Sequence, residues 1–143
     1  MQRGYGKMRY LYRSTTRYKD VDKMGYVHNS VYQVYFEEAR IDMVKSEGYP
    51  YSRVEEEGVI FPISSAHLDY KKPIRYDENF IVEVYFEYMK SYSFKIAYKI
   101  VDEAGAEICS GYTIHASVLA KDNDFYEIPE AMKVIGKKYY EKQ

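Results

Sequence analysis

Two consecutive stretches of alternating residues constrain the fold of this chain more than any other feature. The first stretch covers residues 80–88 and the second covers 92–100, and in each of them every second residue is apolar or aromatic. A period of two is typical of a β-strand that packs one face on a core. Only a short turn at Lys90-Ser91 separates the two stretches. The pattern therefore predicts two strands joined by a tight turn.

One long helix is predicted from near Ser30 to Gly48, where Pro50 bars any continuation. Ser30 and Gln33 have the spacing of a capping box. Apolar side chains recur at steps of three and four residues, which predicts a single buried face. The residues on that face are Tyr32, Tyr35, Phe36, Ala39 and Met43.

Three further strands and a short helix complete the prediction. The strands cover residues 8–18, 59–70 and 108–119, and Pro62 suggests an irregular or edge start for the second. Pro129 suits the first turn of a short C-terminal helix. A single helix cannot separate several parallel strands, so the later strands should pair antiparallel. We predict an α+β fold in which an antiparallel sheet of about five strands curls around one long helix.

Length and charge bound the class of protein. A chain of 143 residues is expected to form one domain, residues 1–143. The balance of 21 basic and 22 acidic residues offers no global field for nucleic acid or an anionic membrane. No stretch has the roughly 18 apolar residues of a membrane span, and residues 1–7 show no secretory signal. The single cysteine, Cys109, fits a reducing compartment and a buried thiol. We expect a cytoplasmic protein.

Asp22 is the leading candidate for chemistry. It lies in a loop that contains Gly25 and leads directly into the predicted helix. A helix start offers free backbone N–H groups and partial positive charge, which suit a developing oxyanion. A carboxylate beside such donors suits acyl transfer. Composition alone favours the alternative that Asp22 is a turn or capping residue.

The segment from Tyr18 to Arg40 resembles the active-site segment of the hotdog-fold acyl-CoA thioesterases, in the 4-hydroxybenzoyl-CoA thioesterase and YbgC-like group. That family carries a pattern like Tyr-x-Asp-x-Asp-x-x-Gly-x-Val-x-Asn-x-x-Tyr, followed by Tyr-Phe-Glu-x-Ala-Arg. The chain matches it nearly throughout this segment. After it, the resemblance weakens to the strand pattern and the turn between Tyr70 and Asp77. The resemblance implies the hotdog fold and hydrolysis of an acyl thioester.

The resemblance also assigns roles in catalysis. It makes Asp22 the catalytic carboxylate, which either activates a water or attacks the thioester carbonyl itself. Asp20 then shapes the loop, and Gly25 permits a tight backbone path. Asn29 occupies the position whose backbone N–H points at the thioester oxygen. As an alternative, Asn29 is simply a helix-start residue.

Contacts with substrate are expected at several other positions. His28, Tyr32 and Glu37 are candidates for the wall of the pocket, although a solvent-facing or structural role competes for His28. Phosphates of coenzyme A need cations. We expect these in the basic turn formed by Lys71, Lys72 and Arg75, or else at Lys90 and Ser91.

No metal or cofactor is expected. His67 and Asp69 share a strand face, but the sequence offers no third ligand nearby. Coenzyme A would be part of the substrate.

Three hypotheses for function remain open at this point. The first is hydrolysis of an acyl-CoA, the second is hydrolysis of a thioester delivered by acyl carrier protein, and the third is a binding module without turnover. The resemblance implies a homo-oligomer, either a dimer or a tetramer, with the pocket at a subunit interface. The acyl group remains open, because aromatic-rich walls suit a phenyl, naphthoyl or aliphatic group.

Overall fold

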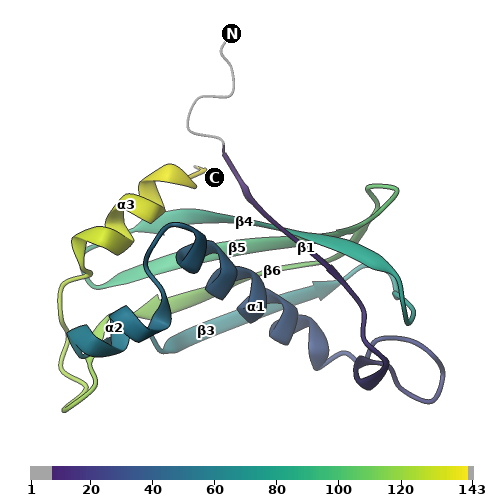
Figure 1. Ribbon diagram of the computed structural model, residues 1–143, viewed down its shortest axis with the longest axis horizontal. Helices are drawn as coiled ribbons and strands as arrows, with labels where there is room; N and C mark the ends of the chain where they lie inside the picture. Colours follow the sequence, from purple (N-terminus) through teal and green to yellow (C-terminus); the bar gives the residue numbers. More distant parts are fainter. Residues whose placement is uncertain (1–7, 142–143) are drawn as a thin grey trace, which may run out of the picture.

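The computed structural model describes residues 8–141, so the expectation about residues 1–7 lies outside the described part. It contains one antiparallel sheet of five strands in the order β1-β4-β5-β6-β3. The sheet curls around helix α1, Val31–Ser46, in the predicted way (Figure 1). Its strands are β1 (Tyr10–Thr15), β3 (Ile63–Tyr70), β4 (Asn79–Met89), β5 (Ser93–Asp102) and β6 (Glu107–Ala116).

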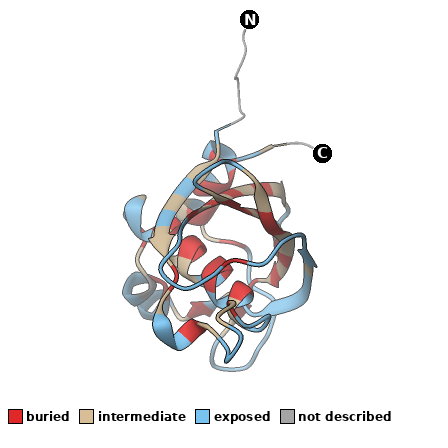
Figure 2. Ribbon diagram, turned by 90° about the vertical axis from the view of Figure 1, so that its right-hand side faces the viewer, coloured by how far each residue is buried: buried red, intermediate tan, exposed pale blue. Residues whose placement is uncertain are grey.

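The core lies between α1 and the concave face of the sheet. All five residues predicted for the inner face of the helix are buried, and Figure 2 shows buried segments of the helix enclosed by the curled sheet. The ring of Phe36 stacks on that of Tyr98 in β5, with centroids 4.3 Å apart. The ring centroid of Tyr35 lies 4.5 Å from that of Phe80 at the start of β4. These contacts fix where the helix lies along the sheet.

The prediction of one strand over residues 59–70 was wrong. The structure has two strands there, β2 (Val59–Ile60) and β3, with Pro62 between them. Proline lacks a backbone N–H and cannot complete a ladder. The carbonyl of Pro62 instead accepts the N–H of Ala116, and β2 leaves the main sheet.

The predicted strand over residues 108–119 divides in the same way. β6 ends at Ala116, and β7, Val118–Leu119, pairs with β2 in a separate two-stranded sheet. Ser117 interrupts the ladder, because its N–H bonds the carbonyl of Tyr92.

Two further helices flank the sheet. α2, Tyr51–Glu57, was missed because its sequence is polar. Its signals were Pro50 before its first residue and Gly58 after its last, the latter with φ +73°. α3, Glu130–Lys138, confirms the predicted C-terminal helix and buries Met132 and Ile135. No helix within residues 8–141 combines the length and the apolar character needed to cross a membrane.

Gly111 provides a test of this packing. A Cβ at this position in β6 would lie 2.0 Å from the carbonyl oxygen of His67 and 3.1 Å from Phe36 Cε2. The oxygen belongs to the backbone of β3, so the clash can be relieved only by separating the strands. We expect Gly111→Ala to lower the free energy of unfolding by about 3 kcal/mol, measured by urea denaturation. Ser110→Ala, the neighbouring control, should cost less than about 1 kcal/mol; equal stability of the two variants would contradict this packing.

Candidate active site

A small hairpin carries Asp22 to the start of α1. The N–H of His28 bonds the carbonyl of Asp20 at 2.9 Å, and the N–H of Asp22 bonds the carbonyl of Tyr26 at 2.8 Å. Val21 and Val27 form a bridge between these two contacts. Gly25 at the tip has φ +85°, a conformation that glycine adopts at little cost. The hairpin therefore holds Asp22 and the start of the helix in one rigid unit.

Within the described residues, the Asp22 carboxylate uses one of its two oxygens for structure. Oδ1 accepts the N–H groups of Met24 at 2.8 Å and Tyr26 at 3.3 Å. The side chain is exposed, and no described residue bonds Oδ2. Asp22 thus combines the turn role that composition favoured with a second oxygen that is oriented and available.

Asp20 has a different environment. Its side chain is buried, and its Oδ2 accepts hydrogen bonds from the hydroxyl of Tyr35 at 2.7 Å and from Arg17 Nε at 3.1 Å. Burial alone would raise its pKa, but these hydrogen bonds outweigh burial and hold the pKa of Asp20 below its ordinary value. Its contacts are those of a residue that anchors the loop to α1.

The predicted capping box is wrong. Ser30 occupies the cap position of α1, but its side chain makes no capping hydrogen bond. The Ser30 hydroxyl lies 2.9 Å from Nδ1 of His28, and the Ser30 N–H donates to the same nitrogen at 3.2 Å. His28 is exposed, and its Nδ1 replaces the Ser30 side chain as an acceptor for a backbone N–H at the start of the helix.

Asn29 lies at the junction of the hairpin and the helix. Its side chain is exposed. Its backbone N–H has no hydrogen-bond acceptor among residues 8–141, whereas the N–H groups of Ser30 and Val31 are both occupied by His28. The start of α1 therefore presents the Asn29 N–H as a free donor beside the positive end of the helix dipole.

Two other expected pocket residues lie along α1. Tyr32 is buried, its ring contacts Tyr70 edge-on at 5.6 Å, and burial raises its pKa to about 12. Glu37 is exposed, and its carboxylate lies 3.9 Å from the guanidinium of Arg40. Arg40 itself is buried and bonds the hydroxyl of Tyr98 at 3.3 Å, an inward position that the sequence analysis did not predict.

The basic turn before β4 lies beside the Asp22 hairpin. Arg75 lies over the ring of Tyr26 at 4.4 Å, and its guanidinium bonds the Tyr26 hydroxyl at 2.7 Å. Lys72 forms an ion pair with Asp102 at 2.9 Å. Lys71 is exposed and has no ion pair with the described residues. Two of the three expected phosphate ligands thus already have partners within the chain.

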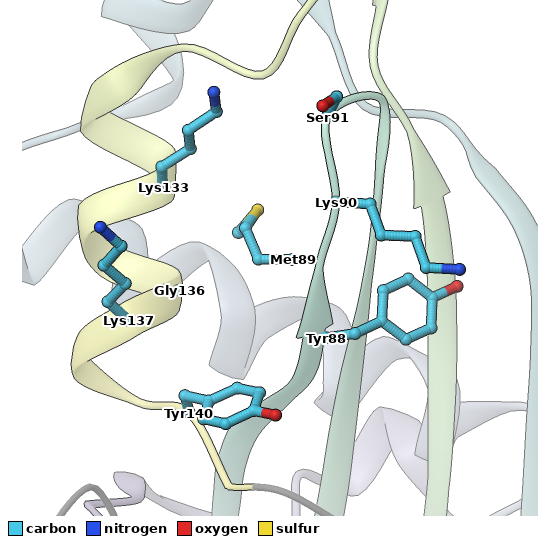
Figure 3. Close-up of a pocket in the computed structure, with 8 residues that line it drawn as sticks. All are labelled: Tyr88, Met89, Lys90, Ser91, Lys133, Gly136, Lys137 and Tyr140. Carbon is cyan, nitrogen blue, oxygen red and sulfur yellow. The ribbon is translucent and has the colours of Figure 1, made fainter.

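A groove of about 570 Å³ opens between α3 and the end of β4 (Figure 3). The structure places Lys90 and Ser91 at its edge, as two of its lining residues. Sequence analysis missed Lys133 and Lys137, which line it from one side of α3 at a four-residue spacing. Lys133 is paired with Glu127 at 2.5 Å, whereas Lys137 has no ion pair within the described part.

The groove and the Asp22 hairpin lie at opposite ends of the sheet (Figure 1). The hairpin bonds the turn before β4, through Val27 N–H and the carbonyl of Ile74, and the groove lies at the last residues of β4. β4 has 11 residues, so at roughly 3.3 Å per residue the two features are about 33 Å apart.

The three residues considered for metal binding or thiol chemistry have only local contacts or are buried. His67 Nε2 lies 3.0 Å from Asp69 Oδ2, and residues 8–141 contain no group of three or more side chains of the metal-binding types. The thiol of Cys109 is buried, which raises its pKa to about 12.

Comparisons with known proteins identify the family of this chain. Residues 16–135 match the thioesterase-like superfamily. The chain is 33% identical over 129 residues to a "Putative esterase" of Aquifex aeolicus, covering 90% of this chain and 98% of that protein. It is 34% identical over 89 residues to the "Putative acyl-CoA thioesterase YneP" of Bacillus subtilis, covering 62% of this chain and 64% of that protein.

A solved structure shows the same fold at low sequence identity. The 1,4-dihydroxy-2-naphthoyl-CoA thioesterase Slr0204 of Synechocystis aligns with a TM-score of 0.85 at 17% identity, over 90% of this chain and 96% of that one. The fold is therefore the hotdog fold. Because the superfamily match spans most of its length, the chain belongs to the thioesterase-like superfamily and is a thioester hydrolase.

Proposed function

We propose that this protein hydrolyses an acyl-CoA to the free acid and coenzyme A at the start of α1. The observation that carries the proposal is the pairing of two available groups on one rigid hairpin. These are Oδ2 of Asp22, which no described residue bonds, and the N–H of Asn29, which has no acceptor among the described residues. The acyl-CoA assignment is supported by the relative named as an acyl-CoA thioesterase.

In this mechanism the thioester oxygen accepts the Asn29 N–H. The donor and the helix dipole stabilise negative charge as the carbonyl carbon becomes tetrahedral. Asp22 then acts by one of two routes. It either takes a proton from a water that attacks the carbon, or attacks directly to form an anhydride that water opens. In both routes the C–S bond breaks and coenzyme A leaves as the thiolate, which takes up a proton.

We further propose that the protein is at least a dimer, formed through β3. This strand is at the edge of the sheet, and among residues 8–141 it pairs only with β6. Seven of its eight residues are exposed, including Ile63 and Tyr70. An exposed edge of this length favours pairing with another strand. Antiparallel pairing with a second copy about a two-fold axis reverses the strand direction, so the Asp22 end of one subunit lies beside the α3 end of the other.

This arrangement would bring the groove of the partner to the Asp22 site. Lys90 and Lys137 have no ion pair among residues 8–141, and the groove is large enough for part of a cofactor-sized ligand. We propose that it holds phosphates of coenzyme A. Lys71, with an exposed amine on the same subunit as Asp22, is the competing position. An acyl carrier protein, which would dock its acidic surface on the same lysines, is the competing carrier.

Asp22→Asn tests the catalytic carboxylate. The amide oxygen of asparagine can still accept the N–H groups of Met24 and Tyr26, so the hairpin should persist. We expect kcat to fall at least about 100-fold, measured by release of free thiol from a panel of acyl-CoA thioesters. Glu56→Gln on the exposed face of α2 is the control and should leave kcat unchanged. Near-normal turnover by folded Asp22→Asn protein would remove Asp22 from the mechanism.

A single turnover in ¹⁸O-labelled water separates the two routes. Label in the Asp22 carboxylate indicates direct attack followed by opening of the anhydride at the aspartyl carbon, whereas label only in the product acid favours an activated water.

Two lysine substitutions, alone and in hybrid dimers, test whether the groove of one subunit and Asp22 of the other form one site. The double variant Lys90→Glu/Lys137→Glu should raise KM for acyl-CoA about tenfold with little change in kcat, because contacts far from the carbonyl bind substrate and transition state alike. The increase should be smaller with a truncated pantetheine thioester, which lacks the nucleotide.

Hybrid dimers of this variant with Asp22→Asn should regain wild-type KM. In such a hybrid, one site combines the unchanged Asp22 of one subunit with the unchanged lysines of the other, so it is intact. A raised KM in the hybrids would place the lysines and Asp22 on one subunit, and a monomer with full activity would contradict the dimer.

Activity should not depend on a metal. The carbonyl of a thioester is reactive and its thiolate leaves readily, so a carboxylate and an N–H donor are sufficient. We expect prolonged dialysis against a chelator to leave kcat unchanged in the thiol-release assay. Loss of activity that one particular divalent ion restores would contradict this expectation.

A further inference from the structure

The peptide groups on either side of Asn29 are held at three of their four polar atoms. The carbonyl of His28 accepts the N–H of Val31 at 2.9 Å. The carbonyl of Asn29 accepts the hydroxyl of Tyr70 at 3.2 Å, and the N–H of Ser30 donates to His28 Nδ1 at 3.2 Å. The fourth atom is the Asn29 N–H itself. The next peptide along the chain is thus clamped by His28 on its N–H and by Tyr70 on its carbonyl.

The contact from His28 has a defined direction. A backbone N–H can only donate, so Nδ1 must present its lone pair and the ring proton lies on Nε2. The Ser30 hydroxyl, 2.9 Å from the same nitrogen, can also donate to it. The imidazole therefore supplies the acceptor at this turn that the Ser30 side chain does not supply as a cap.

The contact from Tyr70 comes from the sheet. Tyr70 is the last residue of β3, and its backbone pairs with Cys109 of β6. Its ring contacts the buried ring of Tyr32, with an angle of 64° between the ring planes. The hydroxyl is thereby held over the start of α1 by the sheet edge on one side and by the helix on the other.

We propose that His28 and Tyr70 are positioning residues that aim the Asn29 N–H at the thioester oxygen. The proposal rests on the function proposed above. An oxyanion donor is effective when it needs no reorganisation during the reaction, and loss of one such donor costs about 10²–10³ in rate. A clamp on the adjacent peptide limits rotation about Asn29 before substrate arrives. His28 then acts through the backbone and needs no contact with substrate.

Kinetics of four variants test the positioning role. We expect His28→Ala and Tyr70→Phe each to lower kcat about tenfold, with KM changed less than about twofold, because a misdirected donor weakens the transition state more than ground-state binding. The double variant should lose less than the product of the two losses, since both residues hold one peptide. His28→Asn should recover most of the rate, because an asparagine oxygen readily accepts the N–H two residues later.

Tyr76→Phe is the matched control. Tyr76 is exposed at the same end of the sheet, and its hydroxyl has no hydrogen bond with the described residues. Its removal should leave kcat unchanged. Unchanged kcat in both His28→Ala and Tyr70→Phe, or a rise in KM alone, would overturn the proposal.

Amide hydrogen exchange gives a readout that does not depend on activity. In the free protein, exchange of the Ser30 N–H measured by NMR should be faster in His28→Ala than in wild type, and His28→Asn should restore its protection. If the wild type hydrolyses no acyl thioester, the proposed function fails while exchange still reports whether the clamp exists. Equal exchange in wild type and His28→Ala would overturn the clamp even in an active enzyme.

Discussion

The packing of one face of α1 into the curled sheet is the contact on which the rest of the structure depends. Phe36 stacks on Tyr98, and Ala39 and Met43 have no exposed surface. Apolar burial of this kind is the main favourable contribution to folding. It also fixes the helix along its axis, and so determines where the free N–H groups of its first turn lie. The position of the candidate active site therefore depends on core contacts, such as that of Phe36 with Tyr98, that lie away from Asp22 and Asn29.

Two aspartates of one hairpin have different roles because their surroundings differ. Asp20 is buried, and its hydrogen bonds to Tyr35 and Arg17 keep its carboxylate ionised and occupied. Asp22, two residues later, is exposed and bonds backbone N–H groups with a single oxygen. Burial keeps the Asp20 carboxylate away from a substrate, whereas the exposed Asp22 carboxylate is oriented through Oδ1 and has no bond to Oδ2 among the described residues. The first aspartate thus holds the loop in place for the second.

The distribution of charge over the two ends of the sheet has a consequence for binding. Arg75 and Lys72 are engaged by Tyr26 and Asp102 at the Asp22 end. Lys90 and Lys137 are without ion pairs in the described part, but they lie at the other end of β4. A single chain therefore separates its candidate carboxylate from these two lysines by the length of a strand, while Lys71, which also has no ion pair with the described residues, lies at the Asp22 end. Pairing through the β3 edge is the simplest way to bring such groups together, which is why the proposed function includes a dimer.

The sequence by itself determined the local elements whose periodicity is strong. Alternation over residues 80–100 predicted β4 and β5, and three- and four-residue steps predicted the buried face of α1. The resemblance of the segment from Tyr18 to Arg40 to the family pattern implied the hotdog fold and thioester hydrolysis, and the superfamily match confirms the family. The strand prediction failed where pairing partners elsewhere in the chain decide which sheet a segment joins. Residues 59–70 were predicted as one strand with an irregular start at Pro62, but β2 pairs with β7 and β3 pairs with β6, in two different sheets.

Only the tertiary structure decided which polar groups around the site have hydrogen-bond or ion-pair partners. Ser30 and Gln33 have the spacing of a capping box, but the ring of His28 takes the Ser30 N–H and Tyr70 arrives from a distant strand. Arg40 is turned inward to Tyr98, and Lys133 and Lys137 line a groove whose opposite edge carries Lys90, with its amine 4.6 Å from the ring centroid of Tyr88. None of these contacts leaves a signal in the spacing of residues along the chain. Hydrogen bonds and ion pairs depend on distances across the fold, and these are set only when the sheet has closed around the helix.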